Sequence, residues 1–474
     1  MQQSEAVEPV GKADLFSTLP AEWRQDLIPQ IQALLRETNQ KVFVLDDDPT
    51  GTQTVHDTIV LTEWTVPALV RELKSADPVC YLLTNSRSVS VAQAVALNQD
   101  IARNLRSAAE RTGRNYTVVS RSDSTLRGHF PAETDALAAS AESPPDGVLI
   151  IPAFMAGGRY TIRGLHYVEE GGVLIPAAQT PYARDSVFGY EHSDLRQWVA
   201  EKTGGRIRAD DVFSLSIDVI RDGGPEAAGV LLDALCDGAV CVVDAVSERD
   251  LEVVALACLR AEAAGKDLIY RSAASFAGIR GGIPIRPTLE AKDMPPMSDN
   301  GGLVVVGSYV TKSSDQLAVL LASGTVKGVE LSVAELLSAA DAGSFLEPTV
   351  QELATILSGG NHAALYTSRD LVNGHDDESS LAIGQRVSQC LVDITRRLPV
   401  VPRFIIAKGG ITSSDLATGA LAVKRARVLG QILPGIPVWQ PDANSLYPGG
   451  AYVVFPGNVG DDGALLRALQ ILTG

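Results

Sequence analysis

The sequence predicts an α/β protein of two domains, each with a mostly parallel sheet flanked by helices. Three observations lead to this fold class. Short runs of apolar and β-branched residues recur along the 474-residue chain, and most are continuous, which is typical of strands buried on both faces of a parallel sheet. Alanine- and leucine-rich stretches with helical spacing separate them. A proline-rich segment, which shows neither the helical nor the strand periodicity of apolar residues, divides the chain in two.

The first domain is assigned to residues 1–280. It opens with LPAEWRQDLIPQIQALLRE (19–37), whose spacing predicts an amphipathic helix packed on the domain. Further helices are predicted between strands, for example over residues 89–113 and 248–265. Strands are predicted at five apolar runs: KVFVLD (41–46), VCYLLT (79–84), YTVVS (116–120), GVLIIP (147–152) and AVCVVD (239–244).

Residues 281–302, GGIPIRPTLEAKDMPPMSDNGG, contain four prolines and are predicted to be a linker. The second domain is assigned to residues 303–474. Its predicted strands are LVVVG (303–307), AALYT (363–367), RFIIAK (403–408) and AYVVFP (451–456). Ligands of open α/β sheets bind beyond the carboxyl ends of the strands, so residues at strand ends are the candidates for a functional site.

Composition narrows the class of partner. The net charge of −17 argues against a nucleic acid or an anionic membrane, because binding phosphate backbones requires clustered lysine and arginine. No apolar stretch reaches the roughly 20 residues of a membrane span, and the first residues resemble no signal peptide. The five cysteines form no CxxC pair, which suits a reducing compartment. We therefore expect a cytoplasmic protein.

Three adjacent carboxylates end the first predicted strand, in LDDDPTGTQTVHD (45–57). A turn that caps the next segment would account for one of them. Three neighbouring carboxylates repel one another unless a cation or a proton offsets their charge. Asp46, Asp47 and Asp48 therefore indicate a functional site.

One interpretation of this segment is a phosphohydrolase. Asp46, Asp48 and Thr50 match the DxDxT nucleophile loop of haloacid-dehalogenase-like phosphatases, and LLTNS (82–86) resembles their second motif. Those enzymes also need a lysine and a later acidic pair, and the GDD at 460–462 lies in the other domain. The match is local, and the alternative stays open.

A second polar segment, SRSDSTLRGH (120–129), follows another strand. An arginine fork suits a carboxylate, and hydroxyls with an aspartate suit a polyol. Arg87, at the end of a different strand, could converge on the same site. These residues favour a small hydroxylated acid as ligand. The long polar loops after the fourth strand add His166 and Arg184, for which structural roles are equally plausible.

In the second domain, three strands are followed by glycine turns, in VVVGSYVTKSSDQ (304–316), IIAKGGITSSD (405–415) and FPGNVGDDGAL (455–465). Backbone N–H groups of such turns and of the helices after them can hold phosphate oxygens. Three together favour a nucleotide or a phosphate. Neither a Walker A sequence nor a G-x-G is present, so a P-loop and a dinucleotide fingerprint are excluded.

In order, these segments resemble the four-carbon acid sugar kinase family, whose members phosphorylate the terminal hydroxyl of 3-oxotetronate, threonate or erythronate with ATP. The resemblance extends from about Lys41 to Gly460. The matching segments are a DDxTG loop (47–51), DSTLRG (123–128), a TPxxRD-like segment (180–185), Gly-Ser (307–308), GGxTS (409–413) and GN-x-G (457–460).

The resemblance implies an acid-sugar-binding first domain, an ATP-binding second domain and an active site in the cleft between them. Asp48 or Asp47 would accept the proton of the attacking hydroxyl, and Asp47 would also hold sugar hydroxyls. Arg127, helped by Arg87, would bind the substrate carboxylate. The remaining expected contacts are Asp123 and Ser124 for substrate, and Ser308, Gly409, Gly410, Ile411, Thr412 and Gly457 for ATP with Mg²⁺.

Two other functions stay open. One is the phosphohydrolase with Asp46 as nucleophile, and the other is a non-catalytic sensor of an acid sugar or nucleotide. The sequence leaves undecided which acid is used, which residues bind the metal and whether the protein is a homodimer.

Overall fold

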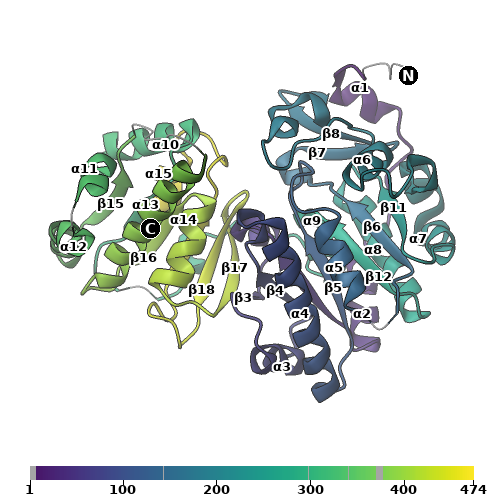
Figure 1. The fold of residues 1–474 in the computed structure, drawn as a ribbon, viewed down its shortest axis with the longest axis horizontal. Helices are drawn as coiled ribbons and strands as arrows, with labels where there is room; N and C mark the ends of the chain where they lie inside the picture. The colour runs from purple at the N-terminus through teal and green to yellow at the C-terminus, as the bar shows by residue number, and fades with distance from the viewer. Residues whose placement is uncertain (1–6, 142, 297, 340, 370–376) are drawn as a thin grey trace. The chain divides into compact units, whose positions relative to one another are not determined.

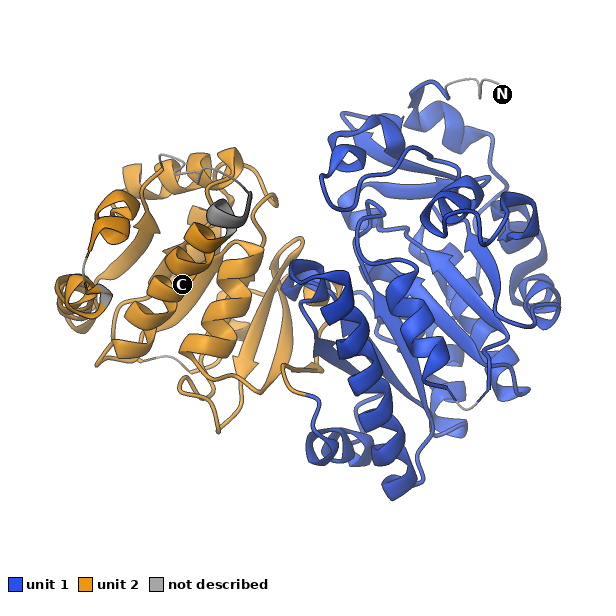
Figure 2. Cartoon of the chain, viewed as in Figure 1, with its two compact units in different colours: residues 1–51, 64–285 blue, residues 52–63, 286–474 orange. Residues whose placement is uncertain are grey.

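The chain forms two compact units, coloured separately in Figure 2. Unit 1 comprises Met1–Gly51 and Trp64–Ile285, and unit 2 comprises Thr52–Glu63 and Arg286–Gly474. The chain crosses between the units after Gly51, Glu63 and Ile285, and the last of these crossings lies inside the segment predicted as a linker. The structure is a computed structural model that describes residues 7–141, 143–296, 298–339, 341–369 and 377–474.

Unit 1 is built on a parallel sheet in the order β10-β11-β6-β12-β5-β2-β4. The five predicted strands of this unit are present, and β10 and β12 were not predicted. The strands are β2 (Lys41–Asp46), β4 (Val79–Leu83), β5 (Tyr116–Arg121), β6 (Gly147–Ile151), β10 (Phe213–Leu215), β11 (Ala239–Val243) and β12 (Leu268–Ser272). Every residue of β2, β4, β6 and β12 is buried, as expected of strands covered on both faces.

Helices flank this sheet (Figure 1). The N-terminal helix was predicted over 19–37 but begins only at Ile28, because Pro29 fits the first turn of a helix and no later turn. Ser90 caps the long fourth helix with a capping box, and Gly113 ends it at φ +66°. The helices are α1 (Lys12–Ser17), α2 (Ile28–Glu37), α3 (Val66–Lys74), α4 (Val91–Thr112), α5 (Ala132–Ala139), α6 (Leu195–Lys202), α7 (Ile217–Asp233), α8 (Glu248–Ala263) and α9 (Ala274–Arg280).

A small antiparallel sheet, in the order β1-β9-β8-β7, belongs to the same unit. Its strands are β1 (Val10–Gly11), β7 (Arg159–Ile162), β8 (Leu165–Glu170) and β9 (Val173–Pro176). The segment 152–171, expected to be a polar loop, thus forms a strand hairpin instead. Tyr160, Tyr167 and Leu174 pack with Ile217 of α7 and with Val246 in one apolar cluster. This packing explains why the segment is ordered as strands.

Unit 2 contains a mixed sheet in the order β3-β17-β18-β19-β16-β13-β15-β14. Its part from β19 to β14 is parallel, and β3, β17 and β18 extend it antiparallel. The strands are β3 (Thr58–Leu61), β13 (Leu303–Val306), β14 (Val326–Leu331), β15 (His362–Thr367), β16 (Phe404–Lys408), β17 (Arg425–Leu433), β18 (Ile436–Pro441) and β19 (Ala451–Phe455). The helices are α10 (Thr311–Ala322), α11 (Val333–Ser338), α12 (Ala342–Ser358), α13 (Asp377–Arg397), α14 (Gly410–Asp415) and α15 (Ala464–Thr473).

Residues Thr52–Glu63 lie far from the rest of unit 2 in sequence but are built into it. β3 pairs antiparallel with β17. The indole Nε1 of Trp439 donates to Thr52 Oγ1 at 2.9 Å, and Arg286 pairs with Asp57 at 2.8 Å. The chain after the acidic segment of β2 therefore passes directly into unit 2, a connection that the sequence analysis did not predict.

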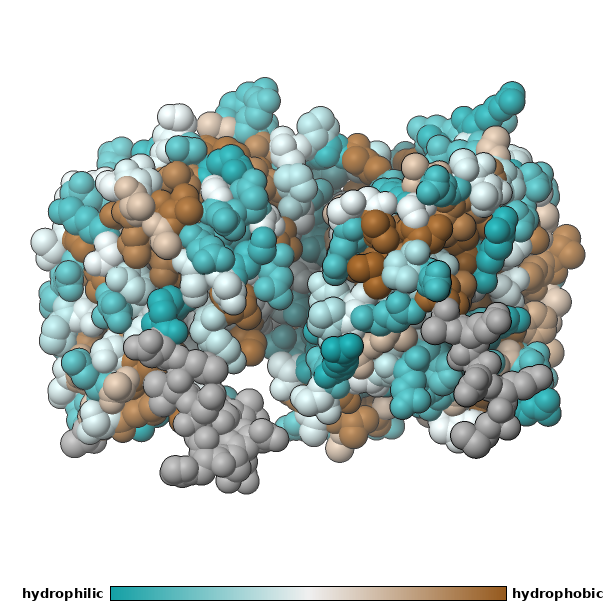
Figure 3. All heavy atoms as spheres, turned by 90° about the horizontal axis from the view of Figure 1, so that it is seen from above, coloured by the Kyte–Doolittle hydropathy of each residue, from teal (hydrophilic) through white to brown (hydrophobic). Residues whose placement is uncertain are grey.

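No helix among the described residues is long and apolar enough to cross a membrane. On the face seen in Figure 3, hydrophilic side chains surround smaller hydrophobic patches. All five cysteines are free, and four of them are buried.

Candidate active site

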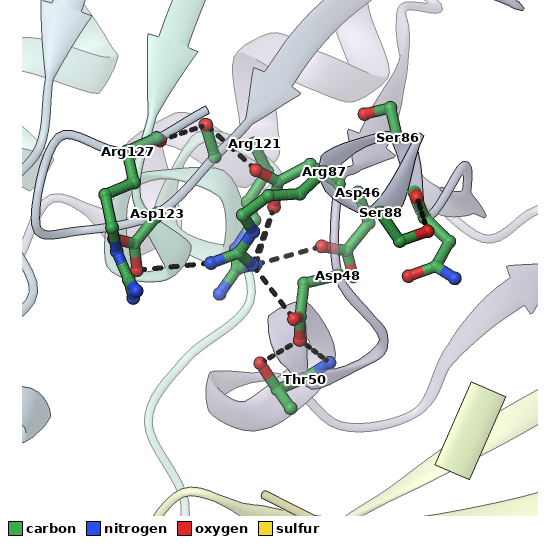
Figure 4. Close-up of polar contacts among 12 residues, drawn as sticks. Asp46, Asp48, Thr50, Ser86, Arg87, Ser88, Arg121, Asp123 and Arg127 are labelled. Atoms are coloured by element: carbon green, nitrogen blue, oxygen red, sulfur yellow. Dashed lines mark hydrogen bonds and ion pairs between the residues drawn. The ribbon is translucent and has the colours of Figure 1, made fainter. Parts of the chain in front are cut away.

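The carboxyl ends of β2, β4 and β5 bring acidic and basic side chains of unit 1 together (Figure 4). β2 ends at Asp46, which lies opposite Arg121, the last residue of β5. Parallel strands end at the same edge of a sheet, so the loops after them meet. These loops carry the remaining charged groups: Asp47, Asp48, Arg87, Asp123 and Arg127.

Arg87 lies at the centre of this cluster. Its Nη2 is 3.2 Å from Asp47 Oδ1 and 3.0 Å from Asp48 Oδ2, and its Nη1 is 3.4 Å from Asp123 Oδ1. Burial by itself would lower the pKa of the Arg87 guanidinium, but these carboxylates raise it overall. The predicted convergence of Arg87 on the loops after β2 and β5 is therefore present.

Asp46 is the fully buried aspartate of the three. Its Oδ1 accepts a hydrogen bond from Arg121 Nη1 at 3.1 Å. Gly51 closes over the carboxylate: a Cβ at this position would lie 1.9 Å from Asp46 Oδ1. A nucleophile has to be reached by its substrate, so this burial argues against the phosphohydrolase that would use Asp46.

Burial also raises the pKa of Asp46 to about 7, with Arg121 opposing the rise and Asp47 adding to it. A carboxyl whose pKa is higher in the folded protein binds its proton more tightly there, so stability falls as pH rises from its ordinary pKa towards 7. We expect the free energy of unfolding of the wild type, minus that of Asp46→Asn, to decrease from pH 5 to pH 7 and then level off. Urea unfolding at several pH values checks this. A difference that is constant with pH would contradict the expectation.

Asp48 has the most accessible carboxylate of the three, with its side chain 25% exposed. The backbone N–H and the hydroxyl of Thr50 donate to its Oδ1 at 2.9 and 2.5 Å. Burial would raise the pKa of Asp48, but Arg87, Arg121 and the bonds from Thr50 lower it overall. Asp48 is therefore ionised at neutral pH, fixed in orientation and open on one side.

Asp47 is nearly inaccessible, with 3% of its surface exposed. Its Oδ1 contacts Arg87 and Arg121, and its Oδ2 accepts a hydrogen bond from Ser122 Oγ at 3.0 Å. Both oxygens are thus engaged within the protein, in contrast to those of Asp48.

The loop after β5 holds a second ion pair. Arg127 Nε lies 2.8 Å from Asp123 Oδ2, and its Nη1 is 3.6 Å from Asp185 Oδ2. The guanidinium also lies 5.2 Å from the ring of Tyr182. Burial would raise the pKa of Asp123, but Arg87 and Arg127 lower it overall. Arg127 keeps 27% of its side chain exposed, so an arginine fork faces solvent beside the aspartate cluster.

Two residues of this region, Arg271 and Gly128, had no predicted role. Arg271, from β12, donates to the carbonyl of Arg127 at 3.0 Å. Gly128 has φ +120°, and a Cβ there would lie 2.4 Å from Ser122 Oγ. Arg271 lies in LIYRS (268–272), where apolar residues are followed by polar ones, and this pattern could have revealed it. The close approach at Gly128 depends on tertiary packing and left no local signal.

The other predicted site residues of unit 1 (Ser124, His166 and Arg184) form none of the ion pairs described above. His166 is fully buried, accepts a hydrogen bond from Thr161 and donates to the carbonyl of Ser124 at 2.7 Å. Burial lowers its pKa to about 4, so it is neutral at pH 7 and acts as a structural bridge. Ser124 is half-buried, and Arg184 is exposed at the end of η5 (Pro181–Arg184).

In unit 2, the loops after β13, β16 and β19 converge. β16 lies between β13 and β19, parallel to both. A Cβ on Gly409, which has φ +118°, would lie 3.0 Å from Ser308 Cβ, and one on Gly457 would lie 3.4 Å from Ser308 Oγ. A Cβ on Gly307 would lie 2.4 Å from Thr412 Oγ1. The predicted residues of the three turns are thus in contact.

Side chains reinforce this convergence. Ser313 Oγ, near the start of α10, donates to Ser308 Oγ at 3.0 Å or to the carbonyl of Gly457 at 3.1 Å. Gly410 begins α14, and Ile411 keeps 62% of its surface exposed. Close backbone approach, a positive-φ glycine and helix starts are the features of a phosphate cradle.

Among the residues that the structure describes, no group of three or more histidine, cysteine, aspartate or glutamate side chains could hold a metal ion.

Comparison with known families matches both units. Residues 42–280 match a sugar-binding N-terminal domain, and residues 303–465 match a nucleotide-binding C-terminal domain. The pair defines a class of two-domain sugar kinases. The chain belongs to the four-carbon acid sugar kinase family, which confirms the resemblance inferred from the motifs.

Curated relatives extend over most of the chain. A D-threonate kinase of Salmonella typhimurium is 27% identical over 366 residues, which cover 75% of this chain and 80% of the relative. A 3-oxo-tetronate kinase of Cupriavidus necator is 27% identical over 424 residues, which cover 85% of this chain and 89% of the relative.

Solved structures share the fold. A Salmonella typhimurium protein superposes with a TM-score of 0.66 at 18% identity, covering 90% of this chain and 98% of its own. A Haemophilus influenzae protein superposes with a TM-score of 0.60 at 16% identity, covering 91% of this chain and 100% of its own. At these identities the likeness concerns the fold alone.

Proposed function

We propose that this protein transfers the terminal phosphoryl group of Mg²⁺-ATP to the terminal hydroxyl of a four-carbon acid sugar, such as threonate, erythronate or 3-oxotetronate. The observation that carries the proposal is the ion-pair network at the carboxyl ends of β2, β4 and β5, where an accessible aspartate lies beside an exposed arginine fork. Family membership and the names of the curated relatives support the same reaction.

On the substrate side, we assign the carboxylate of the acid to Arg127. Its guanidinium is partly exposed and presents a planar fork. Arg87, which joins Asp47, Asp48 and Asp123, would link this end of the substrate to the aspartates. Asp123 would orient Arg127, with Ser124 following it in the same loop.

We assign the proton of the attacking hydroxyl to Asp48. A base is useful when it is ionised and within reach, and Asp48 meets both conditions better than Asp47 does. Asp47 would support it by holding Arg87 and Arg121. A direct bond from Asp47 to a sugar hydroxyl, expected from the sequence, would require its bond to Ser122 to open.

On the nucleotide side, the turns after β13, β16 and β19 would hold the phosphates of ATP through Ser308, Gly409 and Gly457, together with Gly410, Ile411 and Thr412. Phosphoryl transfer depends mainly on positioning and charge neutralisation. Mg²⁺ would supply part of that neutralisation on the phosphates. The hydroxyl and the terminal phosphate must come into contact during turnover.

The proposal is tested by measuring ADP formation and phosphate release separately. ADP formation should require both the acid sugar and Mg²⁺-ATP, whereas a sugar phosphate without nucleotide should release no phosphate. Nucleotide-free phosphate release that disappears in Asp46→Asn would instead establish the phosphohydrolase. Ligand binding without either product would identify a sensor.

A further inference from the structure

Lys408 is a buried cation at the edge of the three converging turns. It is the last residue of β16 and lies opposite Val306 of β13 and Phe455 of β19. Its side chain is fully buried. The ammonium donates to the carbonyls of Pro456 and Gly457 at 2.6 and 3.0 Å, and lies 4.3 Å from the ring of Phe455.

These partners are all uncharged. A buried ammonium without a counter-ion is unfavourable, because carbonyl oxygens and an aromatic face replace its hydration only in part. Buried charges in proteins are normally paired or bound to a ligand. In a chain with 57 acidic residues, the described part offers Lys408 no carboxylate contact, so its burial calls for an explanation.

The charged groups on neighbouring elements do not supply the missing anion. Lys312, on α10, repels Lys408, and the guanidinium of Arg369, after β15, donates to the carbonyls of Val306 and Ser308. Two aspartates that follow the converging turns have partners of their own: Asp415 accepts a hydrogen bond from Ser388, and Asp461 pairs with Arg467 at 2.8 Å. Burial first, and Lys312 second, lower the pKa of Lys408 to about 7.

We propose that Lys408 is a positioning residue of the nucleotide site, whose charge is completed by the phosphates of the bound nucleotide. It fixes the turn that carries Gly457 to the strand that leads into Gly409, and so aligns two of the three turns around Ser308. This inference rests on the proposed function and adds a residue that the motifs did not single out for a role.

This arrangement predicts that Lys408 takes up a proton when the nucleotide binds. Because burial and Lys312 lower the pKa of Lys408 to about 7, most of this side chain is neutral at pH 8 without ligand. Phosphates nearby favour the charged form, so binding should raise the pKa and take up close to one proton. Nucleotide affinity should therefore fall by up to about tenfold per pH unit above pH 7.

Isothermal titration calorimetry of the whole protein with Mg²⁺-ADP at pH 8 tests this, in two buffers that differ in ionisation enthalpy. Roughly one proton should be taken up by the wild type. Lys408→Met should take up none, bind about tenfold or more weakly at pH 7, and lose the pH dependence of affinity. Thermal unfolding verifies that the variant is folded. The matched control is Lys424→Met, which removes an exposed lysine of the same unit, paired with Glu63, and should behave as the wild type.

Wild-type binding at pH 8 without proton uptake would overturn the role of Lys408 and leave the kinase proposal standing. This measurement needs no variant. Proton uptake that persists in Lys408→Met would also overturn it, because another group would then be responsible. If the wild type binds neither ADP nor ATP, the proposed function itself fails.

Discussion

Replacing Asp48 with asparagine is expected to lower kcat by about a hundredfold or more, the range that general bases contribute, while KM for ATP stays nearly unchanged. Asparagine keeps the size of the side chain and can still accept the bonds from Thr50, but it cannot take a proton from the hydroxyl. Steady-state kinetics with saturating ATP measures the effect. Since Arg87 and Arg121 hold the pKa of Asp48 below its ordinary value, the wild-type rate should not fall through this group between pH 6 and pH 8.

The control for this substitution is Asp135→Asn, at an exposed aspartate paired with Arg206, which should keep the wild-type rate. The parallel variant Asp47→Asn separates the two neighbours. If Asp48→Asn retains more than a third of the wild-type kcat and Asp47→Asn is nearly inactive, then Asp47 is the proton acceptor and the assignment made here is wrong.

Replacing Arg127 with alanine should raise KM for the acid sugar about 10- to 100-fold, which corresponds to a charge-assisted hydrogen bond of roughly 1.5–3 kcal/mol. KM for ATP should change by less than about twofold, since the expected nucleotide contacts lie in unit 2. Arg127→Lys should fall between alanine and the wild type, because a lysine keeps the charge but loses the planar fork.

Arg103 provides the matched control, because it is an exposed arginine of the same unit, paired with Asp100 on α4. Arg103→Ala should leave both KM values unchanged. Equal increases in KM for the acid sugar and for ATP in Arg127→Ala would contradict the assignment of the carboxylate, and would point to a general disturbance of the site.

The position of the candidate site followed from local sequence. Continuous apolar runs predicted buried parallel strands, and the polar residues after them had to meet at one edge of each sheet. Their positions after the strands predicted that Asp48, Arg87 and Asp123 lie close together. In the second domain, the glycine turns predicted a phosphate site, whereas the strand order that places the turns of Ser308 and Gly409 side by side appeared only in the structure.

The sequence did not predict features that depend on partners far away in the chain. Asp46, Asp47 and Asp48 look alike in sequence, and their burial depends on strand register, which places Asp46 opposite Arg121. The strand Thr58–Leu61 has only four residues, and its partner β17 lies more than 360 residues later in the chain. No local pattern identifies such a pairing, so the place of Thr52–Glu63 in unit 2 appeared only in the structure.

The central claim is that an acid sugar is phosphorylated at the expense of ATP. The most direct measurement incubates the protein with Mg²⁺-ATP and each of 3-oxotetronate, D- and L-threonate, and D- and L-erythronate, and follows ADP together with the mass and ³¹P spectrum of the product. We predict stoichiometric ADP and a phosphate ester on the terminal hydroxyl for at least one acid, formed at an initial rate about a hundredfold or more lower in Asp48→Asn. A protein that binds nucleotide but forms no ester from any of the five would contradict the four-carbon acid assignment.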